Sequence, residues 1–210
     1  MGRLLSLLLA ALVLVACQNE THAVFSPSPS PSPHTAPTAA ILQSSDVPAN
    51  LTACPGSGPI DVYLSVLIDV DTTLASRDAD YWSQLRNDGA TAGAISVFAA
   101  NPSACKVELG ATTSVKALTS LVVQFADEGQ ADRAWQSGVF GFAPPPAGEV
   151  VQGVTRGTST GLGLSSFVFD RPSVRLACWR RSVFVGLVVA SNMDVATLQA
   201  ATAAIDPRLN

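Results

Sequence analysis

The chain has 210 residues, of which 48% are hydrophobic and 13% are charged, and its formal net charge at pH 7 is −4. This composition is too apolar for a disordered chain, and the scattered basic residues form none of the clustered positive charge that nucleic-acid binding requires. The sequence therefore predicts a folded protein that does not bind nucleic acid.

An apolar run at residues 4–16 follows the single positive charge of Arg3. As a helix this run would extend about 20 Å, whereas the hydrocarbon core of a bilayer is roughly 30 Å thick. The run is therefore too short to span a membrane and is typical of the apolar region of a secretory signal. We expect residues 1–16 to be a signal peptide that directs the chain out of the cytosol.

The end of this run, Leu14-Val15-Ala16-Cys17, resembles the lipobox of bacterial lipoprotein signal peptides. In that family the cysteine thiol receives a diacylglyceryl group and the cysteine becomes the new N-terminus. The resemblance implies that Cys17 carries palmitate-type chains and anchors the protein to a bacterial cell membrane, outside the cytosol. Two acyl chains make such an anchor stable. The alternatives are an ordinary secretory signal with an accidental cysteine and an uncleaved anchor.

Residues 17–45 contain the run SPSPSPSP and almost no apolar residues that could form a core. Proline at every second position favours polyproline II, which extends about 3.1 Å per residue. We expect a lipidated N-terminus and a semi-rigid Ser/Pro-rich spacer, which holds a single globular domain at residues 46–210 away from the membrane. Recognition of the prolines by a partner and O-glycosylation of Ser and Thr are alternatives.

Hydrophobic periodicity predicts the elements of that domain. The segment 58–69 has helical spacing, although its alternate residues would also suit a strand. Helices are predicted at 58–69, 76–87, 127–136 and 194–205, and strands at 93–99, 105–111, 118–126, 149–155, 164–169, 173–179 and 183–190. Strands followed by a helix, twice, predict an α+β fold in which a mostly antiparallel sheet packs against helices.

The C-terminal segment 161–209 contains CWRRSVFVGLVV and then ATLQAATAAIDPRL. It resembles the end of extracytoplasmic sensor-type lipoprotein domains from high-GC bacteria. In those domains a Gly-rich turn precedes paired strands and a closing helix. The resemblance implies a fold rather than a function.

Three cysteines remain once Cys17 is assigned to lipid. Cys54 lies in a Pro/Gly loop and Cys105 at the start of a predicted strand, whereas Cys178 alternates with apolar residues on a face expected to be buried. Exported proteins meet an oxidising environment in which a disulfide persists. We predict a Cys54–Cys105 disulfide and a Cys178 that serves only packing. Three reduced cysteines and a Cys105–Cys178 pair are the alternatives.

Both histidines, His22 and His34, fall in the predicted spacer. Histidine-based hydrolysis and zinc chemistry need imidazoles held in place, so we expect neither in the folded domain, and no cofactor. Carboxylates could still pair across a cleft. The candidate acids are Asp61, Asp69, Asp71, Asp78, Asp80, Glu108, Glu128 and Glu149. The motifs DVD and DAD fit helix caps better than a calcium loop.

The segment SGVFGFAPPP, residues 137–146, places Phe140 and Phe142 on either side of a glycine and before three prolines. Such a rigid, apolar loop could form a ligand or partner surface. The alternative is that both rings fold back onto the core.

These observations favour a membrane-anchored, non-catalytic lipoprotein that binds a small apolar ligand, an envelope component or a protein partner. A cell-envelope enzyme with paired carboxylates and a structural surface protein without a ligand are the alternatives. An apolar groove at Phe140 and Phe142 would favour binding. Two carboxyl groups facing each other about 5 to 10 Å apart in a pocket would favour the enzyme.

Overall fold

Eight antiparallel strands form one sheet in the computed structural model, which describes residues 34–210. Their order is β1-β3-β4-β8-β7-β6-β5, and β2 pairs with β3 beside β1. The strands are β1 (Thr52–Ala53), β2 (Gly58–Pro59), β3 (Ala90–Ala99), β4 (Ala117–Phe125), β5 (Val154–Arg156), β6 (Ser166–Asp170), β7 (Val174–Arg181) and β8 (Phe184–Ser191). The signal peptide and Cys17 lie outside the described residues.

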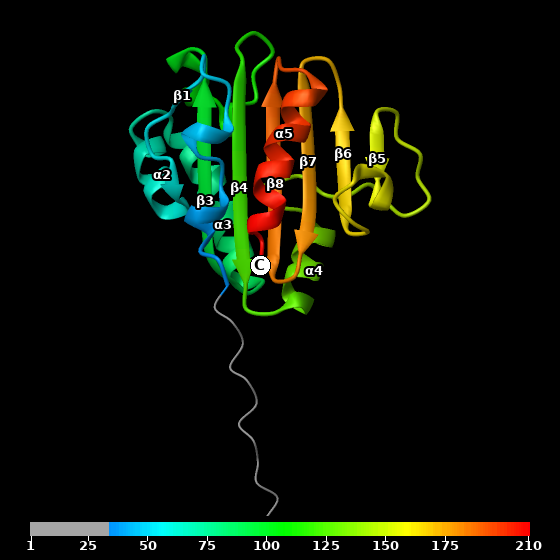
Figure 1. Ribbon diagram of the computed structural model, residues 1–210. Coiled ribbons are helices and arrows are strands. Elements are labelled where there is room, and N and C mark those ends of the chain that lie inside the picture. The colour runs from blue at the N-terminus through cyan, green and yellow to red at the C-terminus, as the bar shows by residue number, and fades with distance from the viewer. Residues whose placement is uncertain (1–33) are drawn as a thin grey trace, which may run out of the picture. The chain divides into compact units, whose positions relative to one another are not determined.

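Helices cover both faces of the sheet (Figure 1). One face carries α2 (Ile60–Ile68), α3 (Thr72–Asn87) and α4 (Glu128–Ser137), and the other carries α1 (Pro37–Ala40) and α5 (Val195–Ile205). The predicted α+β class is therefore confirmed. None of the helices in residues 34–210 combines the length and apolarity that a membrane crossing needs.

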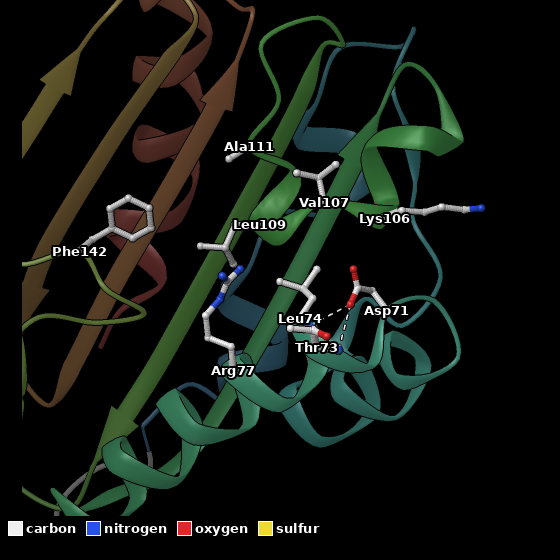
Figure 2. Close-up of a pocket in the computed structure, with 9 residues that line it drawn as sticks. All are labelled: Asp71, Thr73, Leu74, Arg77, Lys106, Val107, Leu109, Ala111 and Phe142. Carbon is white, nitrogen blue, oxygen red and sulfur yellow. Dashed lines mark hydrogen bonds between the residues drawn. The ribbon is translucent and has the colours of Figure 1, made fainter.

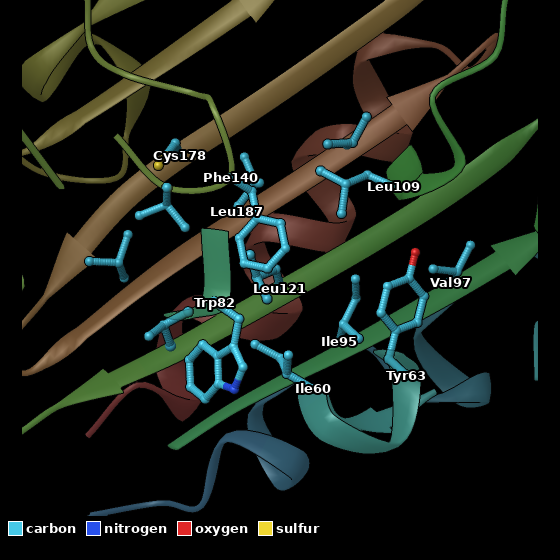
Figure 3. Packing of buried hydrophobic residues seen from close by; sticks show 14 of the residues in the cluster. Ile60, Tyr63, Trp82, Ile95, Val97, Leu109, Leu121, Phe140, Cys178 and Leu187 are labelled. Carbon is cyan, nitrogen blue, oxygen red and sulfur yellow. The ribbon is translucent and has the colours of Figure 1, made fainter. Parts of the chain in front are cut away.

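Each face has its own apolar core because side chains alternate between the two faces of a strand. On the side of α2, α3 and α4, strand pairing aligns Ile95, Leu121, Leu187, Cys178 and Phe167 in one row across five strands. Figure 3 shows the first four of these side chains among the residues of this core. Because both faces of the central strands are buried, their sequences are continuously apolar. Cys178 lies in the core, as predicted.

The opposite core is organised around Trp179, which is fully buried beside Gly186 of the neighbouring strand. A Cβ atom added at Gly186 would lie 2.9 Å from the indole ring, so the glycine makes room for the tryptophan. The indole Nε1 donates to Asp206 Oδ1 at 2.9 Å, which satisfies its buried polar atom.

The compact unit begins at His34, so the predicted domain start at residue 46 is wrong. Residues 40–42 are at most 4% exposed, and the Leu42 backbone N–H donates to Ser120 Oγ at 2.9 Å. The His34 ring lies edge-on to Phe184, so one of the two histidines belongs to the folded unit and not to the spacer. The three apolar residues at positions 40–42 are too few to show the period of a helix or a strand, so the sequence did not indicate that this segment belongs to the domain. Residues 34–210 contain both cores and thus what a domain needs to fold alone.

An ion pair joins the start of this unit to its end. Arg208 donates from both terminal nitrogens to the Asp46 carboxylate, at 2.8 Å each. These hydrogen bonds lower the pKa of Asp46, burial opposes the shift, and the Gln43 backbone N–H, 2.8 Å from Oδ2, adds to it. The pair links the short 3-10 helices Ser44–Asp46 and Asp206–Arg208.

The predicted helices are confirmed, and Asp71, Asp127 and Asp194 accept the capping hydrogen bonds at the starts of α3, α4 and α5. The DVD motif therefore caps a helix as predicted, whereas the DAD motif, residues 78–80, lies inside α3, so its prediction as a cap is wrong. The strand predicted at 105–111 is wrong. That segment forms two 3-10 turns, Pro102–Lys106 and Glu108–Gly110, and a positive φ at Leu109 interrupts the extended backbone that strand pairing needs. The strand predicted at 149–155 is largely wrong as well, because only Val154–Arg156 pairs with the sheet.

Candidate functional site

The two phenylalanines of the predicted surface loop have different environments. Val139 and Phe142 exchange two backbone hydrogen bonds of 3.0 Å, and the residues between them, Phe140 and Gly141, have φ values of 49° and 79°. This is the geometry of a two-residue hairpin turn, which is strained at a bulky residue. Phe140 is buried and its ring centroid lies 5.7 Å from that of Tyr81, whereas Phe142 is half-buried. The turn thus sends one ring into the core and leaves the other at the surface.

An apolar hollow of about 270 Å³ lies beside Phe142. Its floor is the end of the sheet formed by β5, β6 and β7, and its roof is the loop that follows the hairpin turn. No charged or hydrogen-bonding side chain lines it. Its lining residues are Gly141, Phe142, Ala143, Pro145, Val151, Val154, Phe167, Phe169 and Leu176.

Arginine side chains hold the surroundings of this apolar hollow in place. The Arg156 guanidinium donates to the carbonyl oxygens of Pro145 and Pro146, the second at 2.8 Å. The Arg171 guanidinium lies 4.9 Å from the centre of the Phe169 ring, within the range of a cation–π contact. The roof is therefore fixed both by its prolines and by a charge-assisted contact to the sheet.

A second, mixed cavity of about 400 Å³ shares Phe142 with the apolar hollow. Figure 2 shows the nine residues that line it, which come from α3, from the 3-10 turns after β3 and from the hairpin turn. Its charged members are Asp71, Arg77 and Lys106. The Arg77 side chain extends toward Leu109, whereas Lys106 points away from the other lining residues. Asp71 Oδ1 accepts the backbone N–H groups of Thr73 and Leu74 at the start of α3.

No two candidate acids line the same hollow in the described part of the chain. The mixed cavity has one carboxylate, Asp71, and the apolar hollow has none. A hollow beside α5 has one, Asp170, and a hollow beside Tyr63 has none. Asp61 accepts from Trp82 Nε1 at 3.1 Å, Asp78 is buried within α3, and Glu128 lies 3.9 Å from Arg180. The Glu108 side chain lies outside the described part. Within that part, no three His, Cys, Asp or Glu side chains group as metal ligands.

The cysteines have separate structural roles. Cys54 and Cys105 form a disulfide with a Cα–Cα distance of 5.6 Å, which confirms the predicted pairing. Cys178 is free and buried, and burial raises its pKa to about 12. A thiol with that pKa remains protonated at neutral pH and is a poor nucleophile.

Several residues of the two hollows were missed by sequence reasoning. Arg77 lies in a predicted helix without any motif around it, and Lys106, Val107 and Leu109 lie in a segment predicted as a strand. A signal did exist for the floor of the apolar hollow, because the two rings of the FVF motif at residues 167–169 alternate onto one face. Only the tertiary structure brings that face under the Phe142 loop.

The fold and the two hollows together define an α+β domain with a concave, largely apolar site at one end of its sheet. The chain matches no known family model, no curated protein and no solved structure.

Proposed function

We propose that this protein is an extracytoplasmic, lipid-anchored lipoprotein that acts without catalysis and binds a small apolar ligand beside Phe142. The observation that carries the proposal is the apolar hollow of about 270 Å³, which is walled by rings and aliphatic side chains. Concave apolar surfaces of this kind are where small ligands bind.

The compartment is supported by two features of the chain. The lipobox-like sequence ends at Cys17, which is the proposed point of lipid attachment. The Cys54–Cys105 disulfide is of a kind that persists in oxidising compartments and is rare in the cytosol of most organisms. An envelope component or a protein partner could supply the apolar group, but the small volume of the hollow, about 270 Å³, favours a small ligand. The enzyme alternative has no comparable support, because no described hollow brings two carboxylates together.

Binding is tested with a neutral apolar dye, N-phenyl-1-naphthylamine, whose fluorescence rises in an apolar site. Residues 18–210 contain the whole compact unit and avoid the need for detergent. Phe142→Ala should weaken dye binding about tenfold, since a ring contact of roughly 1.4 kcal/mol is lost. Val62→Ala, on the exposed side of α2, is the matched control and should leave binding unchanged. Equal affinities of the parent and the Phe142→Ala variant for the dye would refute binding at the apolar hollow.

The anchor is tested separately on the full chain. Metabolic labelling with radioactive palmitate should label the parent and leave a Cys17→Ser variant unlabelled. A Cys178→Ser variant controls for the loss of any cysteine, and its labelling should match that of the parent. Equal labelling of the Cys17→Ser variant and the parent would refute lipidation at this residue.

A further inference from the structure

The hollow beside α5 lies on the opposite face of the sheet from the apolar hollow, and its lining has a different chemistry. We infer that it is a second binding site, whose ligand is a neutral, polyhydroxylated ring of the size of one sugar unit. This inference goes beyond the proposed function and does not depend on it, because the two hollows share no lining residue.

Strands β5, β6 and β7 contribute to both hollows, because successive side chains of a strand point to opposite faces of the sheet. Strand pairing aligns Thr155, Val168 and Ala177 in one row that faces α5, while their neighbours along the strands face the apolar hollow. Helix α5 and the 3-10 turn Gly157–Thr160 close around this row and leave a volume of about 180 Å³. Sites for drug-sized ligands begin at roughly 300 Å³, so this hollow suits a single ring.

The lining of this hollow is rich in groups that form hydrogen bonds. Six of its eleven residues have a polar side chain. Two of these, Thr160 and Thr202, donate to backbone carbonyl oxygens at 2.9 and 3.0 Å. The side chains of Thr155, Ser159 and Gln199 make no hydrogen bond within residues 34–210. Two hydroxyl groups and an amide can therefore both donate to and accept from the hydroxyl groups of a ligand.

The charge of the hollow favours a neutral ligand. Among the described side chains that line it, only Asp170 is charged, and its Oδ1 lies 2.6 Å from Nε of Arg175 in an ion pair. An anionic ligand would meet a carboxylate and no cation of the lining, whereas a cationic ligand would have to compete with Arg175 for the same carboxylate. A neutral ligand has neither disadvantage.

The rest of the lining is aliphatic and includes Leu162 and Leu198 beside Val168 and Ala177. The C–H groups of a sugar ring can pack against these side chains while its hydroxyl groups reach the polar ones. A ligand without hydroxyl groups would displace water from the polar side chains and give no hydrogen bond in return. The mixed lining therefore fits a polyhydroxylated ring better than a hydrocarbon.

The test is a titration of isotope-labelled residues 18–210, followed by the backbone amide signals in two-dimensional NMR. The neutral probes are glucose and N-acetylglucosamine. At least one of them should shift the signals of Thr155, Ser159 and Gln199 and leave the signal of Phe142 unchanged. Maltose and chitobiose, in which the same rings carry a second sugar, distinguish the two sources of such a ring. Equal binding of the disaccharide indicates the end of a glycan, and its exclusion indicates a free sugar.

Three comparators test the chemistry of recognition. Glucuronate is the anionic counterpart of glucose, glucosamine is the cationic counterpart of N-acetylglucosamine, and cyclohexanol is a ring of similar size with a single hydroxyl group. Each should bind about fivefold more weakly than the neutral sugar that does bind, or less.

Variants assign the binding to named side chains. Thr155→Val replaces a hydroxyl group by a methyl group of similar size, and Gln199→Ala removes the amide. Each should weaken the binding of the neutral sugar about fivefold, because one hydrogen bond is lost. Thr158→Val makes the same substitution at an exposed threonine that does not line the hollow, and it should bind as the parent does. Matching melting temperatures establish that all variants are folded.

The outcomes separate this inference from the proposed function. If neither neutral sugar shifts the signals around this hollow, the second site is refuted, and dye binding at Phe142 is unaffected by that result. Cyclohexanol binding as tight as that of the sugars would overturn the recognition of hydroxyl groups. Tighter binding of glucuronate or glucosamine would overturn the neutral ligand. Unchanged affinity in both Thr155→Val and Gln199→Ala would overturn the assignment of these side chains.

Discussion

The disulfide between Cys54 and Cys105 should contribute more to stability than any other single contact described above. The two cysteines are separated by 51 residues in the sequence. Closing a loop of this length removes chain entropy from the unfolded state, which corresponds to about 4 kcal/mol in the chain-entropy model. For a domain of this size, 1 kcal/mol shifts the melting temperature by roughly 2–4 °C, so reduction should lower it by about 8 to 16 °C.

Reduction should also weaken the mixed cavity, because the bond connects that cavity to the edge of the sheet. The Cys54 backbone N–H donates to the Val97 carbonyl at 2.7 Å, which fixes one side of the disulfide to β3. On the other side, Cys105 precedes Lys106 and Val107, which line the cavity. Without the bond, this wall keeps its own turns, the burial of Leu109 and the hydrogen bonds that Thr119 and Ser191 donate to the carbonyl oxygens of Leu109 and Gly110. Reduction should therefore loosen the part of this wall at Lys106 and Val107 as well as lower the melting temperature.

The assay is thermal unfolding of residues 18–210, followed by circular dichroism with and without dithiothreitol. A thiol titration should count one reactive group in the denatured oxidised protein and three in the reduced protein. A Cys54→Ser/Cys105→Ser double variant should melt near the reduced parent and should not respond to dithiothreitol. If the oxidised and fully reduced parents melt at the same temperature, the entropic argument for this disulfide is wrong.

Three further predictions concern the ion pair and the cores. Asp46→Asn should cost about 1 kcal/mol at neutral pH and reduce the loss of stability in acid, as measured by urea unfolding at several pH values. Since Arg208 lowers the pKa of folded Asp46, the pair stabilises the fold above the ordinary carboxyl pKa and loses this effect as pH falls through the lowered value. Gly186→Ala should destabilise by about 1–3 kcal/mol through contact with Trp179, as measured by urea unfolding. Cys178 should resist iodoacetamide until the chain unfolds, as followed by intact mass, because burial raises its pKa to about 12.

Each of these predictions has a control and an opposing result. Glu149→Gln removes an exposed acid and should leave the acid profile as in the parent, and an unchanged profile in Asp46→Asn would contradict the role of the pair. Gly129→Ala, in a helix with a normal φ and with its nearest new contact at 3.2 Å from Asp127 Oδ1, should destabilise less than Gly186→Ala, whereas a neutral Gly186→Ala would mean that the indole can move aside. Alkylation of Cys178 at equal rates in the folded and unfolded chain would show that this thiol is accessible.

The sequence alone was sufficient for the features that depend on local order. The apolar spacing of α3, the cap at Asp71 and the continuous apolar runs of β4 and β8 each reflect contacts within one element or its periodic exposure. The disulfide partners could also be chosen, because Cys178 has the alternation of a buried strand and the other two cysteines lie in loops. These features give the fold class and one cross-link.

The tertiary structure decided which surfaces are concave and which segments close them. Residues 105–111 alternate like a strand, but the bond to Cys54 and the left-handed backbone at Leu109 and Gly110 turn them into the wall of a cavity. Phe140 and Phe142 are equivalent in the sequence, and only the hairpin turn separates a core ring from a ring at the site. The periodicity of apolar residues indicates which side chains of an element are buried. A hollow forms where no other segment fills the space beside an element. Whether that space is filled is decided by segments that are far apart in the chain.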